Sequence, residues 1–510
     1  MTAGQTVCHD RIRARRVLAP LTRGRVAGIG GAAAICTALA LIATPALATS
    51  SVKADPLTAS AVTASTVKAS TVNASTGNAT SQGPTAADWP GYLDGPRHAS
   101  YSASQTAITP ATASSLTQRW AFSTGAPYEA SPTVADGRVF IGSEDGWFYK
   151  LSMYTGRVLS KVYLGSRPAL TCPARGITST ATVAVNPHNK VLTVYVPGGD
   201  GYLYALRASN LRLEWRSVIG IPSTTVNDYY DWSSPTVAHR RVYIGVASSC
   251  DKPLVRGAVL AFDEGTGKKL GQFFTVPTGR RNHGGSVWSS IAVTRDGDVY
   301  ATTGNGPKSN QFLQDSDSIL KLSPDLKLLG SFQVPQSQAT ADGDFGSSPV
   351  FFGNYVGACN KNGVFYALSR ATMKLVWSQQ IASAAGGNAA CLAAPVYNGT
   401  DLFFGGGTVT INGATYAGSV QELAPSTGAV VWATGLPGDV LGSPTLDGGG
   451  VLTAGIYGGS SPAIDLIDAT SGAVIEQLTT GLTFGQSVFA RNLLFTANSN
   501  GVAAWGLSAN

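Results

Sequence analysis

The sequence is poor in charged residues and in histidine. Asp, Glu, Lys and Arg together make up 13% of its 510 residues, and His occurs five times. So few histidines argue against a histidine-based metal centre, and no Cys–His spacing suits zinc. No CxxCH motif occurs, which excludes a covalently attached c-type haem. The net charge of +7 comes mostly from six arginines in the first 48 residues, so nothing in the remainder calls for nucleic acid as a partner.

The first 48 residues are typical of an export signal peptide. Their arginines precede an apolar run, Val26–Ala43, and Ala46-Leu47-Ala48 offers small residues for cleavage. An uncleaved membrane anchor is the alternative, because the run is nearly long enough to span a bilayer. No later stretch is apolar enough to cross a membrane. We therefore expect an exported protein, secreted or associated with the cell envelope, with no membrane span in the mature chain.

Residues 49–87 form a drifting repeat of Ala, Ser, Thr and Val. The segment has no aromatic residue and no amphipathic period, so it cannot bury a core. We expect a disordered linker between the signal and a folded part that runs from 88 to 510.

The folded part repeats one unit. Glycine occurs at 60 positions of the chain and aromatic residues make up 9% of it, which suits an all-β protein with many tight turns. Each unit opens with a strand marked by Ser-Pro or a similar pair, continues with two strands around a turn, and ends with a fourth strand after a Thr-Gly turn. Tryptophan ends the unit at Trp215, Trp377 and Trp432. The eight first strands are marked at 131–132, 179–180, 234–235, 289–290, 348–349, 394–395, 443–444 and 486–487.

The two ends of the folded part complement each other. The last unit stops at Trp505 without a fourth strand, whereas Leu116–Ser123 has the character of a fourth strand and no unit before it. A closed ring in which the N-terminal strand completes the last unit would leave no exposed edge. The sequence therefore predicts an eight-bladed β-propeller of four-stranded blades. A seven-bladed ring and an array of β-sandwiches are the alternatives.

Four cysteines lie in the folded part: Cys172, Cys250, Cys359 and Cys391. Disulfides are expected in an exported domain, and three pairings are possible. We favour Cys172–Cys250 and Cys359–Cys391, because each pair joins neighbouring repeats.

The stretch 282–306 differs from the other hairpins at its ends. Two short strands flank a turn at Asp296-Gly297, which is ordinary hairpin chemistry. However, a large flat aromatic side chain, Trp288, and an amide, Asn305, stand at the loop–strand junctions. Such positions usually face a ligand rather than a core.

The repeat resembles the tryptophan-docking motif of the pyrroloquinoline quinone (PQQ) dehydrogenases, which are eight-bladed propellers. Asp88-Trp89-Pro90 followed by Tyr101-Ser102 is similar to the start of that family's domain. The resemblance covers essentially all of 88–508 and implies PQQ and Ca²⁺ as cofactors and an alcohol as substrate. The sequence DGDFGSSP at 342–349 resembles the polyvinyl-alcohol dehydrogenase branch more than methanol dehydrogenase. This resemblance implies a polymeric or secondary alcohol as substrate. Non-catalytic propellers share the repeat, so an extracellular binding or assembly module is the alternative function.

The resemblance implies a role for each residue that matches the family's site. Arg175 resembles the arginine that binds a cofactor carboxylate, and Trp288 resembles the tryptophan on which the quinone stacks. Lys361 resembles the basic residue that donates hydrogen bonds to the quinone oxygens. Asp342 and Asp344 resemble an acidic pair of which one is the catalytic base and a metal contact. The further matches are Glu129 and Ser286 as cofactor contacts and Asn305 as a metal ligand.

Three departures accompany these matches. The family's adjacent pair of cysteines is absent, and Cys172 stands alone near that place. The family's calcium-binding glutamate has no equivalent before Val255-Arg256-Gly257, and Asp251 is the nearest acidic residue. No cytochrome domain is attached, which implies that the electron acceptor is a separate molecule.

The residue types suit this chemistry. A planar polyanion needs an aromatic floor and fixed cationic donors, and a hard cation takes amide and carboxylate oxygens. Each side chain also has a structural alternative. Trp288 would dock one blade on the next like Trp215, Asn305 would cap a turn, and Lys361 would be exposed at the Asn362-Gly363 turn.

Overall fold

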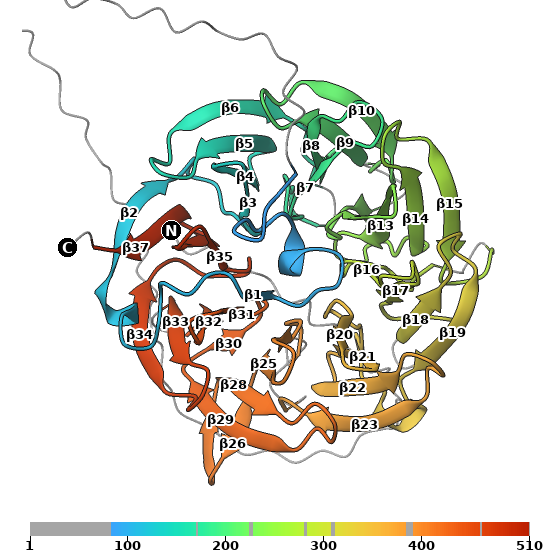
Figure 1. Cartoon of the computed structure of the whole chain (residues 1–510). Coiled ribbons are helices and arrows are strands. Elements are labelled where there is room, and N and C mark those ends of the chain that lie inside the picture. The colour runs from blue at the N-terminus through green and yellow to red at the C-terminus, as the bar shows by residue number, and fades with distance from the viewer. Residues whose placement is uncertain are drawn as a thin grey trace, which may run out of the picture. The chain divides into compact units, whose positions relative to one another are not determined.

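Eight antiparallel sheets follow one another around a ring in the described part of the chain (Figure 1). The structure is a computed structural model, and it describes residues 83–508 except 170–171, 224–227, 280–282, 308–311, 384–390 and 460–461. The predicted export signal and most of the predicted linker lie outside the described residues. Three short 3₁₀ helices, η1 (Tyr92–Asp94), η2 (Ala113–Ser115) and η3 (Gln336–Gln338), are the helices of the described part. None of them has the length and apolar character needed to span a membrane.

Each blade has four core strands, and the strands of blades 1–7 run outward from the axis in chain order. Blade 1 comprises β3 (Thr133–Ala135), β4 (Arg138–Gly142), β5 (Trp147–Ser152) and β6 (Val158–Tyr163). Blade 2 comprises β7 (Thr182–Val185), β8 (Leu192–Pro197), β9 (Tyr202–Arg207) and β10 (Leu213–Val218). Blade 3 comprises β12 (Thr236–Ala238), β13 (Arg241–Ser248), β14 (Ala258–Asp263) and β15 (Lys269–Phe274), with β11 (Tyr229–Tyr230) paired to β13. Blades 4 and 5 comprise β16 (Ala292–Val293), β17 (Val299–Thr302), β18 (Ser318–Leu322) and β19 (Leu328–Gln333); and β20 (Val350–Phe352), β21 (Tyr355–Cys359), β22 (Val364–Ser369) and β23 (Leu375–Gln380).

The last three blades carry the additions to this plan. Blade 6 comprises β24 (Val396–Tyr397), β25 (Leu402–Gly406), β28 (Gly418–Leu423) and β29 (Val430–Leu436), with the hairpin β26 (Val409–Ile411) and β27 (Ala414–Tyr416) inserted. Blade 7 comprises β31 (Thr445–Asp447), β32 (Val451–Tyr457), β33 (Ala463–Asp468) and β34 (Val474–Thr479), to which β30 (Asp439–Val440) and β1 (Tyr101–Ser102) add. Blade 8 comprises β35 (Val488–Ala490), β36 (Leu493–Asn498), β37 (Gly501–Leu507) and β2 (Leu116–Phe122).

The N-terminal strand closes the ring. Strand β2 pairs antiparallel with β37, from Leu116 opposite Leu507 to Phe122 opposite Val502. This pairing supplies the fourth strand that blade 8 lacks, and all eight first strands follow their predicted marker pairs. The prediction of an eight-bladed propeller closed by the N-terminal strand is therefore confirmed, and the seven-bladed and sandwich alternatives are wrong.

Tryptophans of the outer strands dock neighbouring blades. Trp215 donates its Nε1–H to the main-chain oxygen of Glu264 in the next blade, at 3.2 Å. Its ring lies on Gly267, where an added Cβ would come within 2.4 Å of it. Only glycine leaves room for an indole there, which explains the recurring Thr-Gly turns. The same arrangement joins Trp120 to Gly156, Trp377 to Gly428 and Trp432 to Gly472.

The segment 89–102, the axial strap, lies across one end of the ring axis (Figure 1). It contains η1 and β1, and its main chain bonds the first strands of five blades, at Val134, Val183, Val293, Tyr397 and Leu446. Residues of the predicted linker's end also join the folded part, since the main-chain oxygen of Ala87 accepts the N–H of Arg491.

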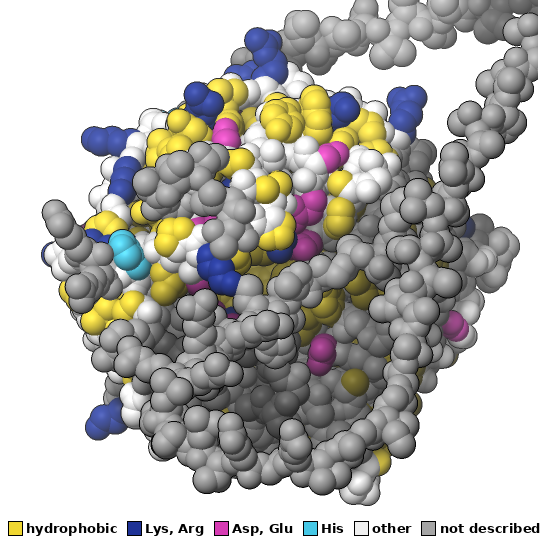
Figure 2. Space-filling model, turned by 180° about the vertical axis from the view of Figure 1, so that it is seen from behind, with side chains coloured by type: hydrophobic (Ala, Val, Ile, Leu, Met, Phe, Trp, Pro, Cys, Tyr) yellow, Lys and Arg dark blue, Asp and Glu magenta, His cyan; other side chains and the backbone are white. Residues whose placement is uncertain are grey.

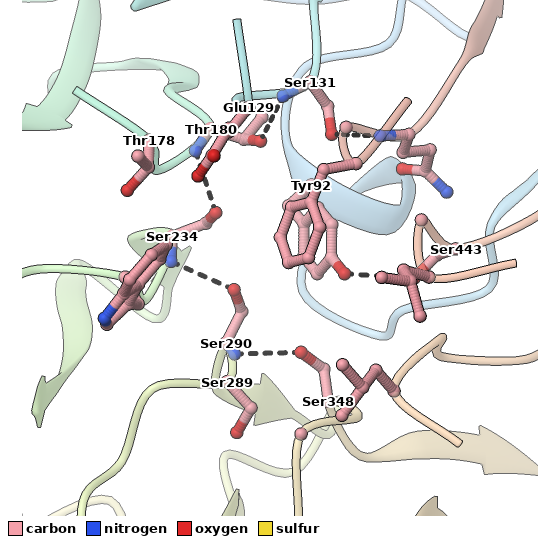
Figure 3. Close-up of a pocket in the computed structure, with 18 of the residues that line it drawn as sticks. Tyr92, Glu129, Ser131, Thr178, Thr180, Ser234, Ser289, Ser290, Ser348 and Ser443 are labelled. Atoms are coloured by element: carbon pink, nitrogen blue, oxygen red, sulfur yellow. Dashed lines mark hydrogen bonds between the residues drawn. The ribbon is translucent and has the colours of Figure 1, made fainter. Parts of the chain in front are cut away.

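Next to the strap, the inner strands build a ring of hydroxyl groups around the axis (Figure 3). Each hydroxyl accepts the main-chain N–H of the corresponding residue in the preceding blade, and Tyr92 of the strap reaches Ser443 with its hydroxyl at 3.0 Å. We call this ring the hydroxyl belt. Its members are Ser131, Thr180, Ser234, Ser290, Ser348 and Ser443.

A second ring lies two residues earlier in each blade, on the side of the belt away from the strap, because extended chain repeats its direction every two residues. With the belt it lines a cavity of about 80 Å³ on the axis. Its members are Glu129, Thr178, Trp232, Trp288, Gly346, Leu392, Leu441 and Phe484.

Both predicted disulfides are present. Cys172 pairs with Cys250, and Cys359 pairs with Cys391. The first joins the loop before β7 to the loop after β13, and both loops contribute to the site described next.

Candidate active site

Trp288 is a member of the second ring and not a blade-docking residue. Its indole lies across Gly346 of the next blade and reaches Leu392 of the one after: an added Cβ on Gly346 would lie 2.6 Å from Cη2 of Trp288 and 2.3 Å from Leu392. Its Nε1–H is buried and has no partner among the described residues, in contrast to the docking tryptophans. Trp288 therefore differs from the docking tryptophans in its position and its hydrogen bonding, and its contact with a cofactor stays a prediction.

Lys361 lies over the ring of Trp288, with Nζ 5.3 Å from the ring centroid. The same ammonium group bonds Oδ2 of Asp344 at 2.9 Å and Oδ2 of Asp342 at 3.1 Å. Burial alone would lower the pKa of Lys361, but Asp344 and Asp342 outweigh it and hold the pKa above its usual value. The lysine is therefore a fixed cation in the site, and the alternative of an exposed lysine is wrong.

Asp251, Asp342 and Asp344 form an acidic cluster in which one carboxylate oxygen of each lies within 4.8 Å of the others. They come from the loops after β13 and before β20, which belong to blades 3 and 5. Burial, and next the charges of Asp344 and Asp342, raise the pKa of Asp251 to about 7. Three converging carboxylates at this spacing suit a hard cation.

Arg175 occupies the other end of the site. Its Nη1 pairs with Oε2 of Glu129 at 3.1 Å and with Oε1 of Glu144 at 3.2 Å. The second glutamate also accepts the N–H of Gly176, at 2.8 Å. Burial, and next the charge of Glu129, raise the pKa of Glu144 to about 7. The arginine lies over the ring of Trp232, with Cζ 4.6 Å from the ring centroid.

The site thus contains two indoles from neighbouring blades, each with a cation over its ring. Trp232 and Trp288 both line the axial cavity and also a neighbouring cavity of about 300 Å³, which Lys361 and the acidic cluster line as well. On the face opposite to that in Figure 1, acidic side chains gather toward the middle of the described surface, while lysines and arginines stand mostly around its edge (Figure 2).

Ser286 and Asn305 lie at the site in different ways. Ser286 lines the larger cavity, and its Oγ accepts the N–H of Ser248 at 3.3 Å. Asn305 reaches Asp344 with its main-chain N–H, while its side-chain Nδ2 donates to the main-chain oxygen of Gly306. The structure therefore brings every predicted site residue to one region, with Asn305 in main-chain contact.

Sequence reasoning missed Glu144 and Asp317. It left open whether the polar aromatic cluster at 229–232, which ends with Trp232, lines a substrate mouth or packs against a neighbouring blade. Trp232 stands three residues before Pro235, as Glu129 stands three before Pro132, so the same rule applied to every blade would have found it. Glu144 follows β4 and carries no local signal. Asp317 is buried, one carboxylate oxygen has no partner among the described residues, and burial raises its pKa to about 7.

A family model described as "Outer membrane protein assembly factor BamB" (PQQ_2) matches residues 60–250 and 361–481. These residues make up more than half of the chain. The chain belongs to the PQQ_2 family.

Relatives of this PQQ_2 protein include dehydrogenases. Quinohemoprotein alcohol dehydrogenase ADH IIB of Pseudomonas putida is 28% identical over 230 residues, which are 37% of this chain and 32% of that protein. The match thus spans about a third of that relative's length. Two solved structures share the fold: quinohemoprotein alcohol dehydrogenase of Comamonas testosteroni (TM-score 0.65, 16% identity, 83% of this chain and 81% of that one) and a europium-containing methanol dehydrogenase (TM-score 0.65, 15% identity, 83% and 98%).

The residues present fit a planar polyanion and a hard cation. The two indoles offer flat apolar surfaces, Arg175 and Lys361 offer charge-assisted donors, and the buried Nε1–H of Trp288 lacks a partner among the described residues. The acidic cluster supplies the oxygen ligands that a hard cation takes.

Proposed function

We propose that this chain is an exported PQQ-dependent oxidoreductase that oxidises an alcohol, with a hard metal ion bound beside the quinone. The observation that carries the proposal is one cavity that two indoles line together with Lys361 and three converging aspartates, while Arg175 lies over the ring of one of these indoles. The sequence similarity to an alcohol dehydrogenase supports the reaction class. By resemblance to the polyvinyl-alcohol dehydrogenase branch, the substrate would be a secondary or polymeric alcohol.

In this proposal, Trp288 would support the quinone ring and Lys361 would donate to its oxygens, while Glu129 and Ser286 would be further contacts of the cofactor. Arg175 binds a carboxylate of the cofactor. Bound PQQ would supply the two-electron oxidant that accepts hydride from the alcohol carbon. Asp344 accepts the hydroxyl proton of the alcohol, because its carboxylate is buried and held by Lys361 and the N–H of Asn305.

The metal ion would bind to the acidic cluster and to the amide of Asn305. Three carboxylates face one ammonium group there, so the cluster keeps excess negative charge when all three are ionised. This charge supports Ca²⁺ or a trivalent lanthanide ion. A separate electron acceptor would then reoxidise the cofactor.

The test is a titration of the purified protein with PQQ in the presence of Ca²⁺ and, separately, of La³⁺. Cofactor absorbance and thermal unfolding report binding, and dye reduction by primary, secondary and polymeric alcohols reports activity. We expect saturable, metal-dependent binding that Trp288→Ala weakens. We expect Asp344→Asn to weaken metal binding, and to abolish dye reduction even at metal and PQQ concentrations that saturate the variant. Failure of the unaltered protein to bind PQQ with either ion would refute the proposal and favour a non-catalytic binding module.

A further inference from the structure

Trp232 lies one blade before Trp288 in the second ring, and the function proposed above assigns it no contact with the cofactor. We propose that the ring of Trp232 is a second aromatic surface of the cofactor site. The guanidinium group of Arg175 stacks on this ring and is thereby held in place to bind a carboxylate at one end of a planar polycarboxylate. This inference rests on the proposed function and assigns the two ends of the ligand to two different indoles.

The ring of Trp232 is fixed in the structure. Its Nε1–H donates to the main-chain oxygen of Ser248 at 3.0 Å, and the ring of Tyr230 packs against it in a T-shaped arrangement with 5.0 Å between ring centroids. The hydroxyl of Tyr230 donates in turn to the main-chain oxygen of Gly176, at 2.8 Å. Trp232 and Tyr230 therefore contact the segment that carries the arginine from two sides.

The guanidinium group of Arg175, which lies over this ring, has N–H groups that remain available to a ligand. Only Nη1 of Arg175 pairs with the two glutamates, Glu129 and Glu144. Its Nε and Nη2 have no partner among the described residues, and a guanidinium can use two such N–H groups to bind one carboxylate. The ring of Trp232 below and the glutamates beside it restrict the plane in which the fork can lie.

The second indole–cation pair has a different character. Lys361 over Trp288 is a compact ammonium group that already bonds two aspartates. It suits a single oxygen atom with developing charge, whereas the fork of Arg175 suits a carboxylate. Because both indoles line the same two cavities, a rigid planar ligand with carboxylates at one end and a reactive oxygen at the other fits the pair.

Removing the indole of Trp232 would free the guanidinium to move onto the glutamates. Because the substitution removes the cation–π contact between Trp232 and Arg175, we expect Trp232→Leu to weaken PQQ binding by about ten-fold. Trp232→Phe keeps an aromatic face and loses the bond to Ser248, so we expect a loss of about three-fold or less. Trp215→Phe, at a docking tryptophan outside the site, is the matched control and should leave PQQ affinity unchanged.

The experiment measures PQQ affinity by absorbance, and Ca²⁺ and La³⁺ affinity without PQQ, for the unaltered protein and the three variants. Near-unchanged metal affinity with weaker PQQ binding in Trp232→Leu supports the proposal. An equal loss of both affinities overturns it, because Trp232 would then act through the loop from Ser248 to Asp251. Tight PQQ binding that Trp232→Leu leaves unchanged overturns this inference alone. Absence of PQQ binding by the unaltered protein overturns the proposed function, and this inference with it.

Discussion

The main chain of Gly346 lies directly against the indole ring of Trp288. A Cβ atom on this glycine would lie 2.6 Å from Cη2 and 2.8 Å from Cζ2 of the ring, closer than carbon atoms approach without strain. The close approach lets the indole extend over Gly346 of the neighbouring blade, where it lines the axial cavity.

A side chain at residue 346 should therefore displace the ring. We expect Gly346→Ala to lower the free energy of unfolding by about 1–3 kcal/mol, as overpacking does, and to weaken PQQ binding at least ten-fold if the indole forms the floor. Denaturant unfolding and the PQQ titration measure the two effects.

Gly271→Ala is the matched control, because an added Cβ there would have its nearest neighbour at 3.6 Å. It should change neither quantity appreciably. Unaltered PQQ affinity in Gly346→Ala, with normal binding by the parent protein, would contradict the assignment of Trp288 as the floor.

The fold could be predicted because its signals are local and repeated. Marker pairs such as Ser131-Pro132 stand at the start of every first strand, and the unmatched strand Leu116–Phe122 indicated how the ring closes. Each such signal reports a turn or a strand start that depends on few neighbours.

The sequence was enough to predict most of the residues that belong to the site, but only some of the contacts between them. Trp288 and Trp215 share a residue type, and only the tertiary structure separates an indole that lines the axial cavity from one that bonds the main chain of the next blade. Likewise, the contact of Asn305 with Asp344 runs through a main-chain N–H, which residue type does not encode. Glu144 was missed because its role depends on Arg175, 31 residues away.

Lys361 should stabilise the protein by neutralising Asp342 and Asp344. Removal of one partner of a buried ion pair costs about 3–5 kcal/mol, because the remaining charges stay buried. We expect Lys361→Met to lower the free energy of unfolding by about 3 kcal/mol in the absence of metal. A divalent or trivalent cation should restore part of the loss, since it replaces the missing charge, so that Ca²⁺ or La³⁺ stabilises the variant more than the parent.

Arg207→Met is the control for this prediction. Arg207 pairs with Glu214 and its side chain is half exposed, so its removal should cost less than about 1 kcal/mol and leave the response to cations unchanged. Equal stabilisation of Lys361→Met and the parent by cations would argue against ion binding at the acidic cluster.

The disulfide between Cys172 and Cys250 joins the loop of Arg175 to the loop of Asp251. Cys250 is exposed, whereas Cys359 and Cys391 are both fully buried. A mild reductant should therefore cleave the disulfide Cys172–Cys250 first. We expect this cleavage to weaken metal and PQQ binding several-fold and to leave the propeller folded. Mass spectrometry of alkylated protein and the two titrations measure the outcome.

A buried ion pair between Arg167 and Asp228 connects the same loops, since Asp228 also accepts the N–H of Cys250 at 2.9 Å. It should keep the loops close after reduction, so the loss of affinity stays partial. The double variant Cys172→Ser, Cys250→Ser is the control: it should match the reduced protein and respond no further to the reductant. A further response would place the effect at Cys359–Cys391.

The buried acids predict that the metal-free protein loses stability as pH rises. Burial raises the pKa of Glu144 and of Asp317 to about 7, and that of Asp94 to about 8. A carboxyl whose folded pKa is raised holds its proton in the folded state after the unfolded chain has released it. The free energy of unfolding then falls with rising pH up to the folded pKa, by at most about 1.4 kcal/mol per pH unit for each such proton.

Denaturant unfolding at pH 6.5 and 8.5 measures this effect. The interval avoids the lower pH range in which His98, with its pKa lowered to about 4 by burial, changes stability in the opposite direction. We expect lower stability at pH 8.5 and a smaller difference in Asp94→Asn, whereas stability that rises over this interval would contradict the neutral form of these carboxyls.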